Sequence, residues 1–347
     1  MPNTNQPCTA HLDTIDSATL MSQPFTPIPF IIESLLPTGL HILCGAPKIG
    51  KSWLTLWLCQ QIAKGEPVWR FATEKKTTLY LCLEDSYNRI QSRLFDITDD
   101  GSPNAYLKNT AGQIGGRLEV EIEDFVAAHP NTGLVVIDTL QKVRRVTNDN
   151  AYASDYRDLG ALKSLADKLG ITILLVHHLR KQHDDDPLNR VSGTTGITGS
   201  ADTNFVLVKD ERSSNSATLY CSGRDIEYRE IKLAFNAATH IWERMESDAE
   251  TSEVRNDYVS LVCGFIGEVG HFLGTASELA ELLQPRCARA ITPGVLAKDL
   301  LQNQRELERR GVRHESRRTN RSRAIELTRI AAASDGSDGK YGIPPVP

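Results

Sequence analysis

Residues 39–63 read GLHILCGAPKIGKSWLTLWLCQQIA: an apolar run, a turn containing glycines, and a second apolar stretch of helical length. The turn GAPKIGKS fits the pattern G-x-x-x-x-G-K-[ST], which requires a strand before it and a helix after it. In such a loop, backbone N–H groups face the phosphates, Lys51 reaches the β and γ oxygens, and Ser52 offers a hydroxyl to Mg²⁺. The sequence therefore predicts a nucleoside triphosphate site formed by Gly45, Ala46, Pro47, Lys48, Ile49, Gly50, Lys51, Ser52 and Trp53.

The composition is that of an ordinary folded protein. Of the 347 residues, 40% are hydrophobic and 24% are charged, which excludes wholesale disorder and fibrous architectures. No apolar run approaches the ~18 residues that cross a bilayer, and the polar start lacks the order of a secretory signal. We therefore expect no membrane partner and a cytoplasmic location. The seven cysteines contain no CxxC pair, which favours reduced packing cysteines over disulfides or a zinc site.

Short β-rich runs alternate with longer helical patterns through the first half of the chain. The runs GLHILC, TTLYLCLE, LVVID and ITILLV are almost wholly apolar, which is typical of parallel strands buried on both faces. The core is therefore expected to be α/β, with a central and mostly parallel sheet. Three later runs indicate antiparallel strands that extend this sheet: residues 203–210, 216–223 and 230–236.

Polar side chains end three of these runs, at the edge where the carboxyl ends of parallel strands meet. Asp138 ends LVVID and can hold the water shell of Mg²⁺ beside the serine of the phosphate loop. Glu84 ends TTLYLCLE and can orient the attacking water, while the adjacent Asp85 can cap the next helix. His177 and His178 end ITILLV; either could bind the γ-phosphate and signal its loss, and we favour His177.

The order of these segments resembles that of RecA-like ATPases of the RepA/DnaB/KaiC group. The segments are GAPKIGKS, TTLYLCLED, LVVIDTLQKVR, ITILLVHHLRK and SGTTGITGSADTNFVLV, followed by SGRD. The nearest resemblance is to RepA-type hexameric replicative helicases of plasmids and phages and to related AAA-family ATPases, over roughly residues 26–243. It implies a RecA-like P-loop core, ATP and Mg²⁺ bound between subunits, a homo-oligomer that is usually a hexamer, and single-stranded DNA in a central channel.

The resemblance also implies residue roles. Glu84 falls at the position of the family's catalytic glutamate, and Asp138 at that of the Walker B aspartate. Arg224, in the SGRD turn, falls where DnaB-like rings place an arginine finger that reaches the neighbouring subunit's γ-phosphate. Ser222 stands where those rings have the lysine of a K-x-R pattern, so Arg224 would have to act alone.

Arg224 also has a structural alternative. Acidic residues follow it closely in the sequence, and an arginine at a turn commonly pairs with such neighbours on the surface. A salt bridge with Asp225 or Glu227 is therefore the alternative to a finger role.

The C-terminal region differs from the core in pattern and charge. Three amphipathic helical segments, one beginning at Thr275 with Glu278 three residues later, precede two short strands around a basic turn, which is the pattern of a winged helix. Between Arg286 and Arg329 there are twelve Lys and Arg but five Asp and Glu, although the whole chain carries a net charge of -5. This asymmetry indicates nucleic acid near one end.

The predicted domain boundaries follow from these changes of pattern. They give a disordered segment at 1–25, a RecA-like ATPase domain at 26–245, a linker at 246–256, a winged-helix-like basic domain at 257–331 and a disordered tail at 332–347.

Two sets of cations are candidates for binding DNA phosphates. The first follows strands of the core and would face the channel: Lys142, Arg144, Arg145, Arg180, Lys181 and Arg190. The second lies on the predicted wing and the helix before it: Arg309, Arg310, Arg313, Arg317, Arg318, Arg321 and Arg323. For each set, the alternative is a solvated face with local ion pairs, such as Glu306 with Arg310.

These observations predict a Mg²⁺-dependent ATP hydrolase that acts on DNA, as a RepA-like replicative helicase or a replication ATPase of a mobile element. An ATP-gated DNA-binding regulator without unwinding activity is the first alternative. A nucleotide-gated signalling hub that does not use DNA is the second. Unwinding of a forked substrate separates the motor from the regulator, and turnover that ignores DNA would favour the hub.

Overall fold

The computed structural model describes residues 14–23, 27–145, 151–178, 195–209, 214–245, 258–287, 290–318 and 323–330. Two compact units make up the chain: Ile28–Glu250 form one, and Met1–Pro27 with Thr251–Pro347 form the other.

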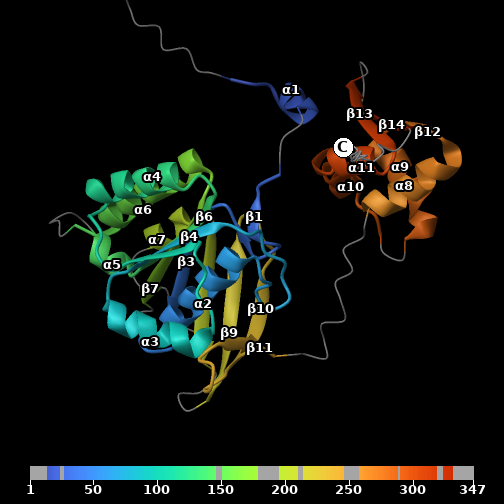
Figure 1. The fold of residues 1–347 in the computed structure, drawn as a ribbon. Coiled ribbons are helices and arrows are strands. Elements are labelled where there is room, and N and C mark those ends of the chain that lie inside the picture. The colour runs from blue at the N-terminus through green and yellow to red at the C-terminus, as the bar shows by residue number, and fades with distance from the viewer. Residues whose placement is uncertain are drawn as a thin grey trace, which may run out of the picture. The chain divides into compact units, whose positions relative to one another are not determined.

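A nine-stranded sheet, ordered β11-β10-β9-β8-β3-β7-β6-β4-β5, forms the centre of the larger unit in the described residues (Figure 1). Neighbours from β5 to β8 run parallel, and those from β8 to β11 run antiparallel. The strands are β3 (Gly39–Gly45), β4 (Thr77–Cys82), β5 (Ala105–Lys108), β6 (Thr132–Asp138), β7 (Thr172–His178), β8 (Thr203–Lys209), β9 (Ser216–Gly223), β10 (Arg229–Phe235) and β11 (Trp242–Arg244).

The prediction of an α/β core with a mostly parallel sheet is confirmed. One strand differs from expectation, because β8 pairs in parallel with β3 instead of antiparallel. Alternation and short turns therefore leave the direction of a strand open, and β8 is buried on both faces, with Phe205 in one core cluster and Val206 in the other. A separate two-stranded ribbon of β1 (Phe30–Ile32) and β2 (Leu36–Pro37) precedes β3.

Helices cover both faces of the sheet (Figure 1). On one face, α2 and α3 pack with side chains such as Leu43, Tyr80 and Val136. On the other, α4 to α7 pack with side chains such as Ile42 and Ile137. Burial on both faces explains why these strands are almost wholly apolar. The helices are α2 (Lys51–Lys64), α3 (Tyr87–Ile97), α4 (Arg117–Ala128), α5 (Leu140–Val143), α6 (Ala151–Leu169) and α7 (Thr195–Ser200).

The smaller unit contains helices around a three-stranded sheet ordered β12-β14-β13. The predicted capping box at Thr275 is present, with hydrogen bonds in both directions to Glu278. The third predicted helix is divided at Asn303, and the short strand β12 was not predicted. The elements of the smaller unit from residue 258 onward are α8 (Tyr258–Val269), β12 (His271–Gly274), α9 (Ala276–Leu283), α10 (Pro293–Gln302), α11 (Gln304–Arg309), β13 (Val312–Arg318) and β14 (Arg323–Arg329), with a 3-10 turn at Gln284–Arg286.

Some predictions concern the ends and linkers of the chain. A short helix, α1 (Ser17–Ser22), lies within the segment expected to be disordered, and Asp16 caps it by accepting bonds from Ala18 and Thr19. The proposed linker at 246–256 and tail at 332–347 lie outside the described residues. Within the described residues, the cysteines are free thiols and no helix is long and apolar enough to span a bilayer.

Candidate functional site

A cavity of ≈ 640 Å³ opens at the edge of the sheet where β3, β4, β6 and β7 end. Strand register places these ends side by side, since Gly45 lies opposite His178 and Asp138 opposite Cys82. The residues that line the cavity are Lys48, Ile49, Gly50, Lys51, Ser52, Trp53, Glu84, Asp85, Arg89, Arg93, Asp138, Thr139, His178, Lys209, Phe235 and His240.

The phosphate loop joins β3 to α2, as the motif predicts. Residues 48–53 line the cavity, whereas Gly45, Ala46 and Pro47 lead into the loop. Gly50 has a φ of 104°, and a Cβ on it would lie 2.8 Å from Trp242 Nε1. Only glycine fits there, because both the backbone conformation and the buried indole exclude a side chain.

Lys51 is folded against its own loop. Its ammonium Nζ donates to the carbonyl oxygens of Gly45 at 2.8 Å and Ala46 at 3.0 Å, and the residue is 6% exposed. Burial lowers the pKa of Lys51, and the nearby carboxylates of Asp138 and Glu84 oppose that shift. The loop thus concentrates a buried cation at the start of a helix, where the helix dipole also favours an anion.

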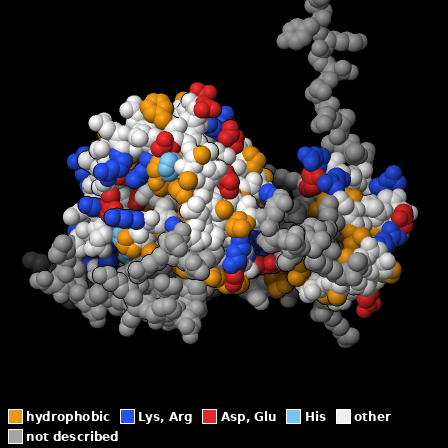
Figure 2. All heavy atoms as spheres, turned by 90° about the horizontal axis from the view of Figure 1, so that it is seen from below, with side chains coloured by type: hydrophobic (Ala, Val, Ile, Leu, Met, Phe, Trp, Pro, Cys, Tyr) orange, Lys and Arg blue, Asp and Glu red, His pale blue; other side chains and the backbone are white. Residues whose placement is uncertain are grey.

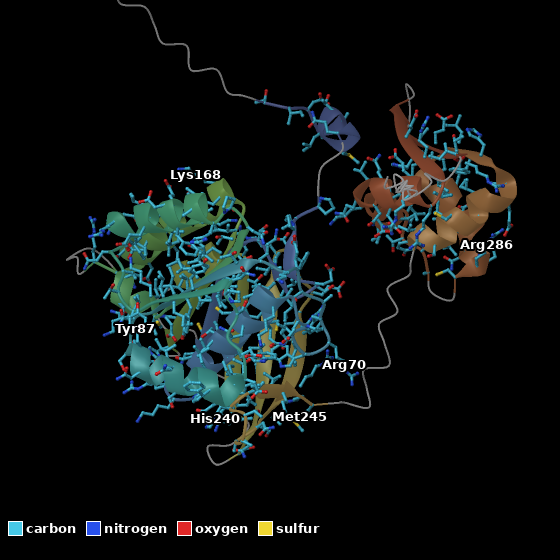
Figure 3. All side chains as sticks on the ribbon, in the orientation of Figure 1. Arg70, Tyr87, Lys168, His240, Met245 and Arg286 are labelled. Atoms are coloured by element: carbon cyan, nitrogen blue, oxygen red, sulfur yellow. The ribbon has the colours of Figure 1, made fainter. Side chains whose placement is uncertain are left out.

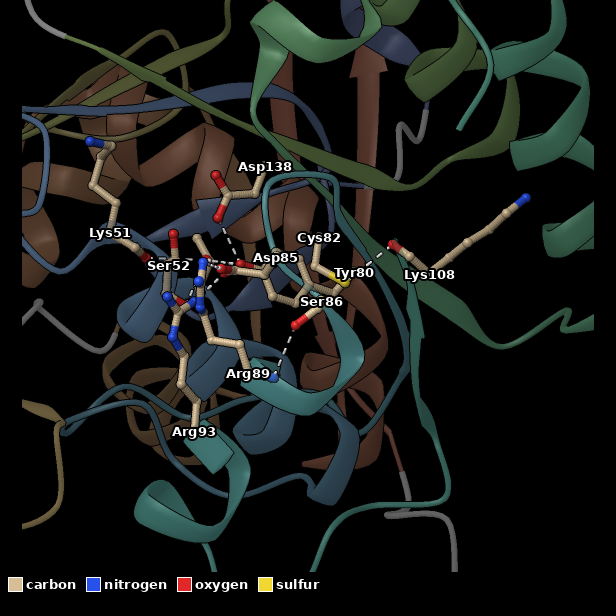
Figure 4. A network of polar contacts seen from close by, with 11 residues as sticks. Lys51, Ser52, Tyr80, Cys82, Asp85, Ser86, Arg89, Arg93, Lys108 and Asp138 are labelled. Carbon is tan, nitrogen blue, oxygen red and sulfur yellow. Dashed lines mark hydrogen bonds and ion pairs between the residues drawn. The ribbon is translucent and has the colours of Figure 1, made fainter. Parts of the chain in front are cut away.

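Asp138 is held by a hydrogen bond from the neighbouring strand β4 (Figure 4). The Tyr80 hydroxyl donates to Asp138 Oδ2 at 2.7 Å, and Ser52 lines the same cavity as Asp138. Burial raises the pKa of Asp138, while the Ser52 and Tyr80 hydroxyls act in the opposite direction. Tyr80 therefore holds the carboxylate in the cavity that the serine of the phosphate loop also lines.

Glu84 and Asp85 have different partners despite their adjacency. Glu84 Oε1 accepts a hydrogen bond from the Thr139 hydroxyl at 3.1 Å. Asp85 pairs with Arg89 at 2.9 Å and with Arg93. The expectation that Asp85 caps α3 is wrong: Ser86 is the N-cap, and its hydroxyl accepts from the Arg89 N–H at 3.4 Å.

His177 and His178 point to opposite sides of β7, because successive strand residues alternate between faces. His178 lines the cavity, whereas His177 is 6% exposed and is not part of its wall. Burial and the neighbouring Lys51 lower the pKa of His178. The structure thus places His178 in the cavity, opposite to our preference for His177.

Arg224 lies far from the cavity. It follows β9, whose last residue pairs with Thr203 at the start of β8, whereas the phosphate loop begins beside Leu207 near the other end of that strand. Arg224 Nη1 lies 3.6 Å from Asp202 Oδ1, and Nη2 donates to the Gly199 carbonyl at 3.2 Å. The acidic partner of Arg224 is therefore Asp202, and not Asp225 or Glu227 as expected. Asp202 is distant from Arg224 in the sequence, so the sequence alone does not indicate this ion pair.

The candidate DNA-binding cations of the core differ in whether they already bind other groups of the protein. Arg144 pairs with Asp155 at 2.6 Å and with Asp158 at 3.0 Å, which ties it to α6. Arg145 donates to the Gly115 carbonyl, whereas Lys142 is exposed. The other members of this set, Arg180, Lys181 and Arg190, lie outside the described residues.

In the smaller unit, Arg309 and Arg310 each pair with Glu306 at 2.7 Å, so the expected local ion pair with Arg310 is present. Arg313 is exposed on β13. The structure does not describe Arg321 or the side chains of Arg317, Arg318 and Arg323.

Several residues of the cavity were not predicted. Arg89 and Arg93 line the cavity from α3, which lies at the lower end of the core in Figure 1. Figure 2 views the molecule from below, and on that face Lys and Arg side chains gather beside acidic ones. The i, i+4 spacing of these arginines on the helix after Glu84 is a signal that could have found them. Tyr80 and His240 gave no local signal, because tertiary folding brings them to the site.

The comparisons with known proteins agree with this architecture. A DnaB-like replicative helicase, whose structure was determined with its interactions with primase, matches the chain with a TM-score of 0.51 and 16% identity. The match covers 60% of this chain and 57% of the helicase chain, and at this identity it shows a shared RecA-like fold. No curated protein sequence matches significantly. The family model for the AAA domain matches residues 6–184, just over half of the sequence, so this chain belongs to the AAA domain family of RecA-like P-loop ATPases.

Proposed function

We propose that the protein hydrolyses ATP with Mg²⁺ and acts on DNA, as a replicative helicase or a replication ATPase of a mobile element. The observation that supports this best is the convergence of Lys51, Asp138 and Glu84 on one cavity. A phosphate-binding cation, a magnesium-holding carboxylate and a residue that positions water are the groups that ATP hydrolysis at a phosphate loop uses.

The residues around Asp138 fit a magnesium site. Mg²⁺ prefers oxygen ligands, keeps several waters and usually takes one or two carboxylates from the protein. Ser52 and Asp138 line the same cavity and offer it a hydroxyl and a carboxylate. When bound there, Mg²⁺ would neutralise charge on the phosphates during transfer.

The remaining roles follow from the positions of the side chains. Lys51 would exchange the loop carbonyls that it now binds for phosphate oxygens. Glu84 would hold a water on the phosphate side of the cavity, with Thr139 fixing its carboxylate. His178, which lines the same cavity, would bind the terminal phosphate and pass its loss to the segment after β7.

We propose that Tyr80 positions Asp138 for the metal. Tyr80→Phe removes the hydroxyl that donates to the carboxylate and keeps the buried ring. Because partners of a metal ligand typically contribute 10- to 100-fold in metal affinity, we expect the Mg²⁺ concentration for half-maximal ATPase to rise by roughly that factor. Tyr106→Phe, the same change at a partly exposed site outside the cavity, is the control. Equal Mg²⁺ dependence in both variants would contradict the role of Tyr80.

We propose that the protein assembles as a ring, a hexamer by resemblance, in which Arg224 acts on the neighbouring subunit's site. Its position at the sheet edge opposite its own phosphate loop supports action in trans. In this proposal, the finger role requires the exposed side chain of Arg224 to leave the buried carboxylate of Asp202, which keeps its bonds to Lys163 and the Leu40 N–H.

Arg224→Ala should then leave ATP affinity nearly unchanged and lower turnover by about 10³-fold or more, the usual effect of losing an arginine finger. Mixed assemblies of Arg224→Ala and Lys51→Ala subunits should regain ATPase activity, because an intact site can form where the two types meet. Thermal unfolding of Arg224→Ala controls for the loss of the Asp202 pair. Inactive mixed assemblies of two stable variants would contradict action in trans.

We further propose that the smaller unit is a winged helix that contacts duplex DNA. The order helix, strand, three helices and hairpin, with β12 completing the sheet, supports this assignment. The basic bias of this region and the position of Arg313 on the hairpin support a phosphate-binding face.

The alternative is a regulator in which ATP controls assembly and the smaller unit does the specific work. The ion pairs of Arg144 with α6 favour it, because they remove one core cation from the set that could contact a strand in the channel. The two functions differ in whether DNA in the channel is coupled to turnover.

A steady-state ATPase assay with single-stranded DNA, duplex DNA or no DNA, at two salt concentrations, tests the proposed function. Stimulation by single strands that fades with salt is the result expected of a motor, because phosphate contacts release counterions. A rate that is indifferent to DNA would overturn the motor and favour the regulator.

A further inference from the structure

The nucleotide cavity is lined by aromatic as well as charged side chains. Trp53, Phe235 and His240, here called the aromatic wall, line it together with the catalytic candidates. Trp53 directly follows Ser52 in the first turn of α2, Phe235 ends β10, and His240 lies in the turn between β10 and β11. Figure 3 shows His240 at the same end of the unit as α3.

The rings of the aromatic wall are in contact. Trp53 and His240 stack with centroids 4.4 Å apart and planes 14° from parallel. Phe235 meets His240 edge-on, with centroids 5.9 Å apart and planes at 71°. The Arg93 guanidinium lies over the Trp53 ring at 5.3 Å, so a cation from α3 borders the same surface.

The turn that carries His240 is fixed by its own hydrogen bonds. Asn236 N–H donates to the Ile241 carbonyl at 2.9 Å, and Asn236 Oδ1 accepts from the N–H groups of Ala238 and Thr239. His240 itself has a φ of 55°, and its Nδ1 lies 3.9 Å from Asp96 of α3. The His240 ring is therefore held by a turn that its own hydrogen bonds fix in place.

The position of the wall relative to the phosphate loop indicates what it binds. Glu84, Asp138 and His178 lie at the ends of β4, β6 and β7, on one side of β3 in the sheet. Phe235 ends β10, on the other side of β3. Trp53 directly follows Ser52, so a chain of phosphates that runs along the loop away from Glu84 and Asp138 leads toward the aromatic wall. Trp53 covers one face of the His240 ring, and the His240 side chain remains 35% exposed.

We propose that the aromatic wall is the nucleobase subsite, in which the base stacks on the exposed part of the His240 ring, which Trp53 supports by stacking. This inference rests on the proposed ATP site. Stacking on a ring has no hydrogen-bond code but scales with ring area, so the site favours purine over pyrimidine nucleotides.

The test compares the binding of ATP, UTP and inorganic tripolyphosphate, each with Mg²⁺, by calorimetric titration of the full chain. His240→Ala should weaken ATP binding by about 5- to 100-fold, the effect of losing one base–aromatic stack, and weaken UTP binding less. Tripolyphosphate binding should not change, because it has no base. Phe95→Ala, which removes a 75% exposed aromatic of α3 outside the cavity, should bind all three like the wild type.

A second variant separates stacking from a folding defect. His240→Phe keeps a flat ring on the same turn and should bind ATP within a few-fold of the wild type. If His240→Ala leaves the ratio of ATP to tripolyphosphate affinity unchanged, or if His240→Phe is as weak as His240→Ala, the base subsite is elsewhere. Those results leave the phosphate site intact provided that Lys51→Ala still abolishes tripolyphosphate binding. Wild-type binding by Lys51→Ala would instead overturn the proposed ATP site itself.

Discussion

Lys51→Ala is expected to abolish ATP turnover and to weaken ATP binding by roughly 30-fold to several thousand-fold. The reason is electrostatic: Lys51 is the buried cation of the phosphate loop, and truncating one partner of a buried, hydrogen-bonded charge pair costs about 2–5 kcal/mol. Calorimetric titration with Mg²⁺-ATP and a steady-state ATPase assay measure the two effects separately.

Lys48 offers a matched control in the same loop. It also lines the cavity, but its backbone has a φ of 62°, so asparagine is a better replacement than alanine. Lys48→Asn removes the same charge and keeps the loop conformation, and we expect it to lose far less affinity than Lys51→Ala. Equal losses would mean that total loop charge matters and the position of Lys51 does not. Unchanged turnover in Lys51→Ala would overturn the phosphate-loop assignment.

Features that depend on neighbouring residues were predicted well from the sequence. The phosphate loop is one continuous stretch, so its glycine, lysine and serine come with the strand and helix that position them. Asp138 and Glu84 were found because the ends of buried parallel strands meet at one edge, which fixes where a terminal carboxylate lies. In both cases a local rule implies a three-dimensional position.

Side-chain direction was harder to predict than strand position. His177 and His178 are adjacent, and a choice between them needs the face on which each lies. That face depends on the register of β7 against β3, where Cys44 lies opposite His177 and Gly45 opposite His178. A shift of one residue would exchange the two histidines, and an apolar run that is buried on both faces gives no sign of which register holds.

Contacts between distant segments were missed altogether. Asp202 binds the Leu40 N–H at 2.9 Å, Lys163 at 2.7 Å and Arg224, and these partners are spread over most of the core sequence. Burial of that carboxylate requires such partners, but no spacing in the sequence identifies them. The placement of His240 beside Trp53 has the same origin, because it follows from the pairing of β10 with β9 and β11.

Glu84→Gln is expected to keep ATP binding within a few-fold of the wild type while lowering turnover by about 10²- to 10⁴-fold, the usual contribution of a general base. Glutamine has the same shape, and its amide oxygen can still accept the hydrogen bond from Thr139 that orients residue 84. What it loses is the negative charge that polarises a water for attack. Single-turnover hydrolysis, compared with the affinity for ATP from titration, separates the chemical step from binding.

Asp85→Asn is the matched control for Glu84→Gln. It removes the neighbouring carboxylate of the same cavity, and this carboxylate already binds Arg89 and Arg93. Because each carboxylate oxygen of Asp85 already pairs with a guanidinium group, Asp85 is not free to orient a water, so Asp85→Asn should retain most of the single-turnover rate. If Glu84→Gln keeps full turnover and Asp85→Asn loses it, the base is Asp85, and the two arginines must move away before it can act. If both variants lose turnover but only Asp85→Asn also loses ATP affinity, Glu84 is the base and Asp85 holds the arginines that border the nucleotide.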